Sequence, residues 1–254
     1  MLNYTKNKRN PDLIFGIRSV LEAIDSGKEI NKVLIKSGTE GALLIELKKK
    51  LAEKKIVYQY VPEEKINRLA FNKNHQGVIA LISPVEYTPL EELIPSLFEK
   101  GVSPLIIALD GITDVRNFGA IARSALALGA HGLLIPEQTG VSVTSDAIKT
   151  SAGALFHIPT CRTRNLSASL EFLRLSGLQI IACTEKAEKK VGQINFQAPT
   201  VLVFGCEESG ISPACLKKAH EQVKISINPD GVSSLNVSTA VAIFLYAVQQ
   251  SRNL

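Results

Sequence analysis

The sequence predicts an α/β protein: a C-terminal part built on a largely parallel sheet, preceded by a smaller α/β unit. Short apolar runs with few polar residues alternate with amphipathic helical stretches, a pattern typical of parallel sheets covered on both faces. Residues 84–104, rich in proline and glutamate, separate two such alternating segments and indicate a boundary. We therefore expect an N-terminal domain over 1–85, a linker over 86–102 that includes a helical stretch of two turns, and a C-terminal domain over 103–254.

The N-terminal domain is expected to alternate helices and strands, since its apolar spacing switches between the two periods. The spacing predicts helices over 19–27, 41–55 and 63–70, and strands over 30–37, 56–61 and 77–83. Residues 1–85 carry 15 Lys and Arg against 9 Asp and Glu, whereas 103–254 carry 13 against 11. This basic excess indicates a polyanionic partner or an ordinary solvated surface, and charge alone leaves both open.

The C-terminal domain is expected to supply the main sheet. Its apolar runs predict strands over 104–111, 131–137, 178–185, 200–208 and 222–228, and a long helix over 233–250. In open α/β sheets, ligands bind beyond the carboxyl ends of the strands. We therefore look for chemistry in the loops that follow these strands.

Several classes of protein are not supported. No apolar run approaches the roughly 20 residues that cross a bilayer, and no apolar stretch follows the basic N-terminus as in a secretory signal. The four cysteines (Cys161, Cys183, Cys206 and Cys215) are scattered, and the four histidines are not at ligand spacing. We expect no membrane partner, no metal and no disulfide framework, and a reducing, cytoplasmic setting.

The first loop of interest follows the strand that ends near Asp110. Asn117 either caps the next helix or points its amide into the cleft. That helix is rich in alanine, which reflects either helix propensity or the close passage of another backbone. Arg116 and Arg123, seven residues apart, would share a helix face and form either a phosphate clamp or surface salt bridges.

The second loop contains Gly205, Glu207, Glu208 and Gly210 directly after an apolar strand. Glycines there let the backbone approach a ligand closely. The chain has neither G-x-G-x-x-G nor G-x-x-x-x-G-K-[ST], so a conventional nucleotide-binding loop is not supported. Two adjacent carboxylates in a loop are usually solvated, but Glu207 stands next to a strand end.

The third loop leads into the final helix, and its Pro-Asp-Gly at 229–231 is typical of a turn. Ser233, Ser234 and Asn236 follow, either as helix caps or as groups that bind an anion or a hydroxyl. A serine triad is disfavoured because no G-x-S-x-G elbow is present.

Together these loops resemble the three motifs of the SpoU (TrmH-like) family of SPOUT RNA 2′-O-ribose methyltransferases. The first motif is DVRNFGAIARSA (114–125), the second LVFGCEESGIS (202–212) and the third SINPDGVSSLNVSTA (226–240). FGIRSVLEAI (15–24) and HQGVIALIS (75–83) resemble the ends of that family's small RNA-binding domain, similar to certain ribosomal proteins. The family often has Pro where Val115 stands and Asn or Ala where Cys206 stands.

The resemblance implies a homodimer with a deep trefoil knot in the C-terminal sheet and S-adenosylmethionine bound in that knot. Matching positions imply cofactor-binding roles for Gly205, Ile227 and Leu235. They imply catalytic roles for Asn117, Arg123, Glu207, Ser234 and Asn236. We expect Arg123 to position the ribose hydroxyl and a phosphate, since arginine stays protonated. Arg116 is expected to bind RNA.

The implied function is methylation of a ribose 2′-hydroxyl, with a guanosine of large-subunit ribosomal RNA as the first candidate and transfer RNA as the second. A non-catalytic RNA-binding protein on the same fold is an alternative. A nucleotide-binding metabolic enzyme is a third interpretation, disfavoured by the lack of a standard phosphate loop. The sequence names neither the nucleotide nor the general base.

Overall fold

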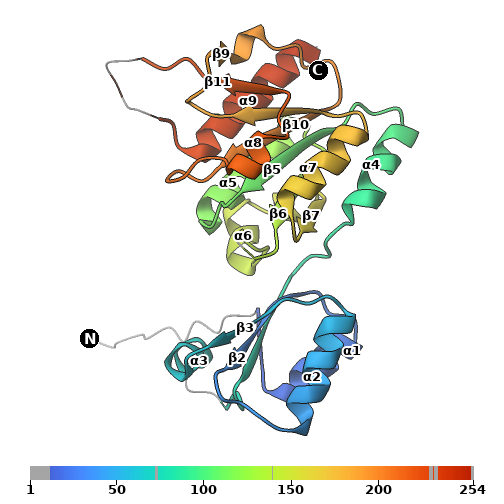
Figure 1. Cartoon of the computed structure of the whole chain (residues 1–254), viewed down its shortest axis with the longest axis vertical. Coiled ribbons are helices and arrows are strands. Elements are labelled where there is room, and N and C mark those ends of the chain that lie inside the picture. The colour runs from blue at the N-terminus through green and yellow to red at the C-terminus, as the bar shows by residue number, and fades with distance from the viewer. Residues whose placement is uncertain (1–11, 72–73, 139, 229–230, 232–233, 253–254) are drawn as a thin grey trace. The chain divides into compact units, whose positions relative to one another are not determined.

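The computed structural model describes residues 12–71, 74–138, 140–228, 231 and 234–252. The chain divides into two compact units, Met1–Glu86 and Tyr87–Leu254. Each unit has its own sheet (Figure 1).

The first unit is a four-stranded sheet of order β1-β4-β2-β3, in which only the β2–β3 pair is parallel. Its elements are β1 (Leu13–Phe15), α1 (Ile17–Asp25), β2 (Ile30–Lys36), α2 (Ala42–Glu53), β3 (Tyr58–Val61), α3 (Glu63–Ala70) and β4 (Val78–Ile82). Helices α1 and α2 pack on one face of the sheet and α3 on the other, so apolar side chains of β2 are buried on both sides. The predicted helices and strands are confirmed, and the short β1 was not predicted.

The second unit is a seven-stranded sheet, parallel throughout, of order β7-β6-β5-β10-β8-β11-β9. Its strands are β5 (Leu105–Asp110), β6 (Gly132–Pro136), β7 (Thr160–Thr163), β8 (Gln179–Cys183), β9 (Lys189–Lys190), β10 (Thr200–Gly205) and β11 (Glu221–Lys224). Its helices are α4 (Leu90–Glu99), α5 (Val115–Ala127), α6 (Ser145–Thr150), η1 (Ala154–Phe156), α7 (Leu166–Leu175), η2 (Val191–Gln193), α8 (Pro213–Leu216) and α9 (Val237–Arg252). The predicted parallel α/β class is confirmed. Strands β7 and β9 escaped prediction because neither is an apolar run.

Helices cover both faces of this sheet. Alternate residues of the central strands pack with α4, α7 and α8 on one face. On the other face α9 packs against α5 and β10, where the Phe204 and Phe244 rings meet edge to face at 5.6 Å. Residues Leu105–Leu109 are all at most 1% exposed. The two-sided burial explains why the central strands read as continuous apolar runs.

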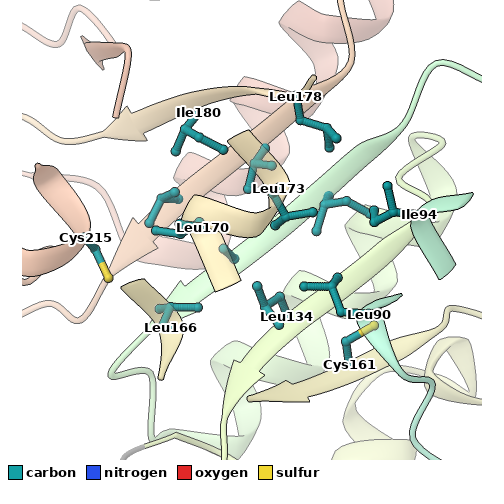
Figure 2. Close-up of a cluster of buried hydrophobic side chains, with 14 of the residues drawn as sticks. Leu90, Ile94, Leu134, Cys161, Leu166, Leu170, Leu173, Leu178, Ile180 and Cys215 are labelled. Atoms are coloured by element: carbon teal, nitrogen blue, oxygen red, sulfur yellow. The ribbon is translucent and has the colours of Figure 1, made fainter. Parts of the chain in front are cut away.

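The segment expected to be a linker with two helical turns, 86–102, forms the longer helix α4. Its helix α4 buries Leu90, Leu93, Ile94 and Leu97 in the core of the second unit. Figure 2 shows Leu90 beside Leu134 of β6 and Cys161 of β7, with Ile94 in the same cluster. The four buried residues of α4 have the i, i+3, i+4, i+7 spacing of one helix face. Burial of that face offsets the free-energy cost of placing Pro95 inside the helix. The segment therefore belongs to the second unit.

The strand order decides which loops meet. Strands β5 and β10 are neighbours although they are far apart in sequence, and Gly205 pairs in register with Asp110. The loops after these two strands therefore begin side by side at the carboxyl edge of the sheet. Strands β8 and β11 are the next two neighbours, so their loops leave the same edge.

Candidate functional site

Three predicted site residues, from three different loops, are joined by hydrogen bonds. Asn236 donates through Nδ2 to Oδ1 of Asn117 at 3.0 Å and to Oε1 of Glu207 at 2.9 Å. Asn117 donates through Nδ2 to the same Glu207 oxygen at 3.4 Å. The three residues lie before α9, in the first turn of α5 and after β10. We call this set the amide–carboxylate cluster.

The side chain of Asn117 is available to the cluster because another residue caps α5. Asp114 is the N-cap, and its Oδ1 accepts a hydrogen bond from the Arg116 backbone N–H at 2.6 Å. This hydrogen bond holds the pKa of the Asp114 carboxyl below its usual value. The interpretation of Asn117 as a helix cap is therefore wrong, and its amide points to Glu207 and Asn236 instead.

Asn236 has two roles at once. Its Oδ1 accepts hydrogen bonds from the backbone N–H and the hydroxyl of Ser238, at 2.9 and 2.6 Å, as an N-cap of α9 does. Its Nδ2 is then directed at Asn117 and Glu207. The start of α9 is thereby fixed relative to α5, so a helix cap also sets the geometry of the cluster.

Glu207 sits on a tight turn built around Gly205. A Cβ on Gly205 would lie 2.0 Å from the carbonyl carbon of Gly210 and 2.2 Å from the nitrogen of Ile211. The turn is closed by a hydrogen bond from the Gly210 N–H to the Cys206 carbonyl at 2.9 Å. The Gly205 position therefore needs glycine because the chain itself passes so close.

Cys206 and Asp110 stabilise the same turn. Hydrogen bonds from Ser209, whose Oγ lies 2.9 Å from Sγ, lower the pKa of the Cys206 thiol. Asp110, at the end of β5, accepts a hydrogen bond from the Ser212 N–H at 2.8 Å. The turn is thus held to the neighbouring strand on one side.

A pocket lies between the loops that follow β8 and β11 and the first turns of α9. Its lining includes the predicted Ile227, Ser234 and Leu235. Seven further residues line it that the sequence did not suggest: Cys183, Thr184, Glu185, Lys224, Ile225, Ala240 and Phe244. The available signal was the position of Thr184 and Glu185 at the carboxyl end of the apolar strand predicted over 178–185. We call this the β8–β11 pocket.

A second pocket adjoins the amide–carboxylate cluster. Asn117 and Glu207 line it together with Thr113, Cys206 and Val237 among others. The cluster therefore forms part of a hollow surface rather than a packed core. Ser234 is exposed and lines the β8–β11 pocket, and it makes no hydrogen bond to the cluster within the described residues.

The structure places the two arginines outside the cluster. Arg116 has 86% of its side chain exposed and pairs with Asp114 at 3.5 Å. Arg123 is exposed and has no hydrogen-bond or ion-pair partner in the part of the chain described here. Both lie within α5 and share one face of it, as predicted. Arg123 is six residues beyond Asn117, which places it about 120° around the helix and about 9 Å along it.

Close packing accounts for the small residues of α5. A Cβ on Gly119 would lie 2.5 Å from Cβ of Thr150 and 2.9 Å from the backbone nitrogen of Ser151. Ala122 and Ala125 are fully buried where α5 contacts its neighbouring helices. The backbone at Thr150 and Ser151 therefore passes close to α5. This agrees with the interpretation that its small residues make room for another segment of the chain.

Two other kinds of site are absent from the described part of the chain. No group of three or more His, Cys, Asp or Glu side chains there is arranged to hold a metal ion. No helix among the same residues has both the length and the apolar character needed to cross a membrane.

The chemistry available is that of a polar site beside an apolar one. The Oε2 atom of Glu207 has no hydrogen-bond donor among the described residues, so it can accept from a ligand hydroxyl. The β8–β11 pocket offers Ile225, Ile227 and Phe244 to a flat apolar group.

Comparison with known proteins gives two family matches. The model of the SpoU rRNA methylase family matches residues 104–246. A model described as the RNA 2′-O ribose methyltransferase substrate-binding domain matches residues 13–88. The boundary between the two matches agrees with the division of the chain at Glu86 and Tyr87.

Individual relatives cover almost the whole chain. YacO of Bacillus subtilis, assigned to the TrmH family of tRNA/rRNA methyltransferases, is 32% identical over 95% of this chain and 96% of its own length. The uncharacterized tRNA/rRNA methyltransferase slr0955 of Synechocystis is 34% identical, and this chain spans 63% of that relative.

Solved structures share the fold. A crystal structure of an RNA 2′-O ribose methyltransferase matches with a TM-score of 0.56 and 28% identity, covering 95% of this chain and 89% of that one. The SpoU methyltransferase AviRb of Streptomyces viridochromogenes, crystallised with S-adenosylmethionine, matches with a TM-score of 0.59 and 23% identity over 95% and 90%. The second likeness shows the fold alone.

Proposed function

The chain belongs to the SpoU rRNA methylase family, and on this premise we propose that it transfers a methyl group from S-adenosylmethionine to a ribose 2′-hydroxyl of RNA. The observation that carries the proposal is the amide–carboxylate cluster, which joins Asn117, Glu207 and Asn236 at the carboxyl edge of the sheet. Ligand sites of α/β sheets lie at this edge.

The β8–β11 pocket is the proposed cofactor site. Its apolar residues Ile225, Ile227, Leu235 and Phe244 suit an adenine ring. The carboxylate of Glu185 can accept hydrogen bonds from ribose hydroxyls or pair with a positively charged group of the cofactor. The cofactor supplies an electrophilic methyl group on a sulfonium centre. Gly205 contributes indirectly, since its packing against the Gly210–Ile211 backbone shapes the adjacent turn.

The cluster is the proposed binding site of the reacting ribose. The free Oε2 of Glu207 accepts a hydrogen bond from the target nucleotide, while Asn117 and Asn236 hold the other oxygen in place. A fixed acceptor orients the hydroxyl for in-line attack, which a mobile side chain would do poorly. Ser234, beside the cofactor pocket, orients the same nucleotide.

Arg123 is proposed to position the ribose hydroxyl and a neighbouring phosphate from the helix face that it shares with Arg116. A guanidinium is suited to phosphate because its planar fork donates two hydrogen bonds. Arg116 then binds RNA farther along that face. Neither role requires arginine to lose its proton.

The remaining parts of the proposal follow from family membership. The first unit binds the RNA substrate, which is a guanosine of large-subunit ribosomal RNA or, second, a transfer RNA. The enzyme is a cytoplasmic homodimer that needs no metal, and the loops around β10 and β11 form a trefoil knot. Its basic N-terminal segment suits a polyanion.

The test is methyl transfer by the purified full-length chain. S-adenosylmethionine labelled in the methyl group is incubated with the protein and either 23S ribosomal RNA or bulk transfer RNA, unmodified in both cases. We expect label in alkali-resistant dinucleotides, because a 2′-O-methyl group blocks alkaline cleavage at that ribose. Glu207→Gln should reduce the single-turnover rate while calorimetric binding of S-adenosylhomocysteine is kept.

Two results would contradict the proposal. Absence of S-adenosylhomocysteine binding at millimolar ligand would exclude the β8–β11 pocket as a cofactor site. RNA binding without any label transfer would favour the alternative, a non-catalytic RNA-binding protein on this fold.

A further inference from the structure

Two tyrosines of the first unit are exposed on one side of an edge strand. Tyr58 and Tyr60 are 41% and 43% exposed and alternate along β3, so both side chains project from the same face of the sheet. Strand β3 is the last strand of the order β1-β4-β2-β3. Neither ring belongs to the apolar clusters that hold this unit together. About two fifths of each tyrosine is therefore open to a ligand.

The two rings are held in a defined arrangement. Their centroids are 6.0 Å apart and their planes are at 84°, an edge-to-face pair. The ammonium group of Lys48, from α2, lies 5.2 Å from the centroid of the Tyr60 ring. These contacts restrict the rings in advance, which lowers the entropy that a ligand must offset.

The charge around the rings selects the ligand class. Residues 1–85 carry 15 Lys and Arg against 9 Asp and Glu. Within α2, Lys48 lies at the Tyr60 ring, while Lys49 and Lys50 pair with Glu53 and Asp25. Two copies of such a surface repel one another, whereas a polyanion is attracted. Aromatic rings beside basic side chains are the usual components of sites for unpaired nucleotides, where bases stack and phosphates meet cations.

We propose that Tyr58, Tyr60 and Lys48 form a platform that binds an unpaired, splayed segment of the RNA substrate. Bases stacked on rings at 84° to each other cannot themselves be parallel, which excludes a continuous helical stack. The bases of a duplex have their faces covered already. The segment is therefore a loop or bulge, the part of an RNA that proteins read most readily.

This inference rests on the proposed function, in that it takes RNA to be the substrate. It goes further by naming the surface and the form of RNA that the surface binds. Tyr58, Tyr60 and Lys48 all belong to the first unit, so the platform can be tested separately from methyl transfer.

The experiment measures binding of fluorescein-labelled RNA by the full-length chain. The probes are a mixed-sequence single strand of about 12 nucleotides, within the length that stacking platforms accommodate, and a duplex of equal length. Tyr58→Leu and Tyr60→Leu each keep an apolar side chain but remove the ring. Each should weaken single-strand binding about fivefold or more, given the usual strength of base–aromatic stacking. Tyr58→Phe and Tyr60→Phe should retain near wild-type affinity.

A matched pair of lysine variants separates local contact from general charge. Lys48→Ala and Lys49→Ala both remove one positive charge from α2, but only Lys48 touches a ring, and Lys49 is 78% exposed. Lys48→Ala should weaken single-strand binding more than Lys49→Ala does. Thermal unfolding of every variant shows whether the first unit is still folded.

Three outcomes overturn the platform. The wild type and both Leu variants bind the single strand with equal affinity, the Leu variants lose equal affinity for duplex and single strand, or the Leu variants change oligomeric state while their RNA affinity stays the same. Methyl transfer and S-adenosylhomocysteine binding by the wild-type chain are measured alongside. If both persist while the ring variants bind RNA normally, the platform is wrong and the proposed function stands. If the wild-type chain neither binds RNA nor transfers methyl groups, both fail.

Discussion

Replacement of Gly205 by alanine tests whether close backbone packing shapes the site. The added Cβ would lie 2.0 Å from the Gly210 carbonyl carbon, 2.2 Å from the Ile211 nitrogen and 2.3 Å from the Gly210 carbonyl oxygen. Carbon atoms in contact are normally about 3.5 Å apart, so each neighbour would have to move by more than about 1 Å. All three are backbone atoms, and no side chain can rotate away to relieve the clash.

The cost of Gly205→Ala follows from how firmly both sides are held. Gly205 ends β10, which pairs with β5 and β8 on its two edges, and Asp110 ties the far side of the turn to β5. Overpacking of a well-packed site costs typically 1–3 kcal/mol. Because neither side can yield, we expect a loss of about 3 kcal/mol in the free energy of unfolding. For a unit of this size that lowers Tm by about 6–12 °C.

Thermal and urea unfolding at fixed protein concentration provide the assay, with S-adenosylhomocysteine binding as a second readout. Gly192→Ala is the matched control, because a Cβ there meets nothing within 4 Å and its φ is not positive. We expect the control within about 0.5 kcal/mol of wild type. If Gly205→Ala has the same Tm and the same free energy of unfolding as Gly192→Ala, and binds S-adenosylhomocysteine with equal affinity, the packing argument is wrong.

Three further predictions concern other parts of the chain. Arg123→Lys should lower the single-turnover methylation rate by on the order of 10² with cofactor affinity unchanged, whereas Arg116→Ala should mainly weaken RNA binding; near wild-type rates for Arg123→Lys would remove its proposed role. A fragment over 87–254 should fold and bind S-adenosylhomocysteine, but one over 103–254 should expose the core that α4 covers and aggregate; equal solubility and melting would contradict this. Cys206, with its lowered pKa, should react with iodoacetamide at neutral pH several-fold faster than the buried cysteines, because more of it is thiolate, and a uniform rate would refute this.

The sequence by itself determined most of the secondary structure and the loops in which the candidate site residues lie. Central strands such as β5 and β10 are covered on both faces, so their apolar runs and the helices between them predicted a parallel sheet. The motifs containing Asn117, Glu207 and Asn236 could be recognised because each lies at or after the end of a predicted strand and resembles a family motif. These features are local, and local residue patterns are sufficient to specify them.

Only the tertiary structure decided how these parts meet. The prolines of 86–102 predict a linker, whereas the core that the leucines of α4 enter is made by strands elsewhere in the chain. The role of Asn117 depended on whether Asp114 capped the helix, and both residues are competent caps. The β8–β11 pocket depended on the placement of β8 next to β10 and β11. Each of these outcomes rests on contacts between distant segments, and the free energy of such contacts depends on the strand order, which residue periodicity does not encode.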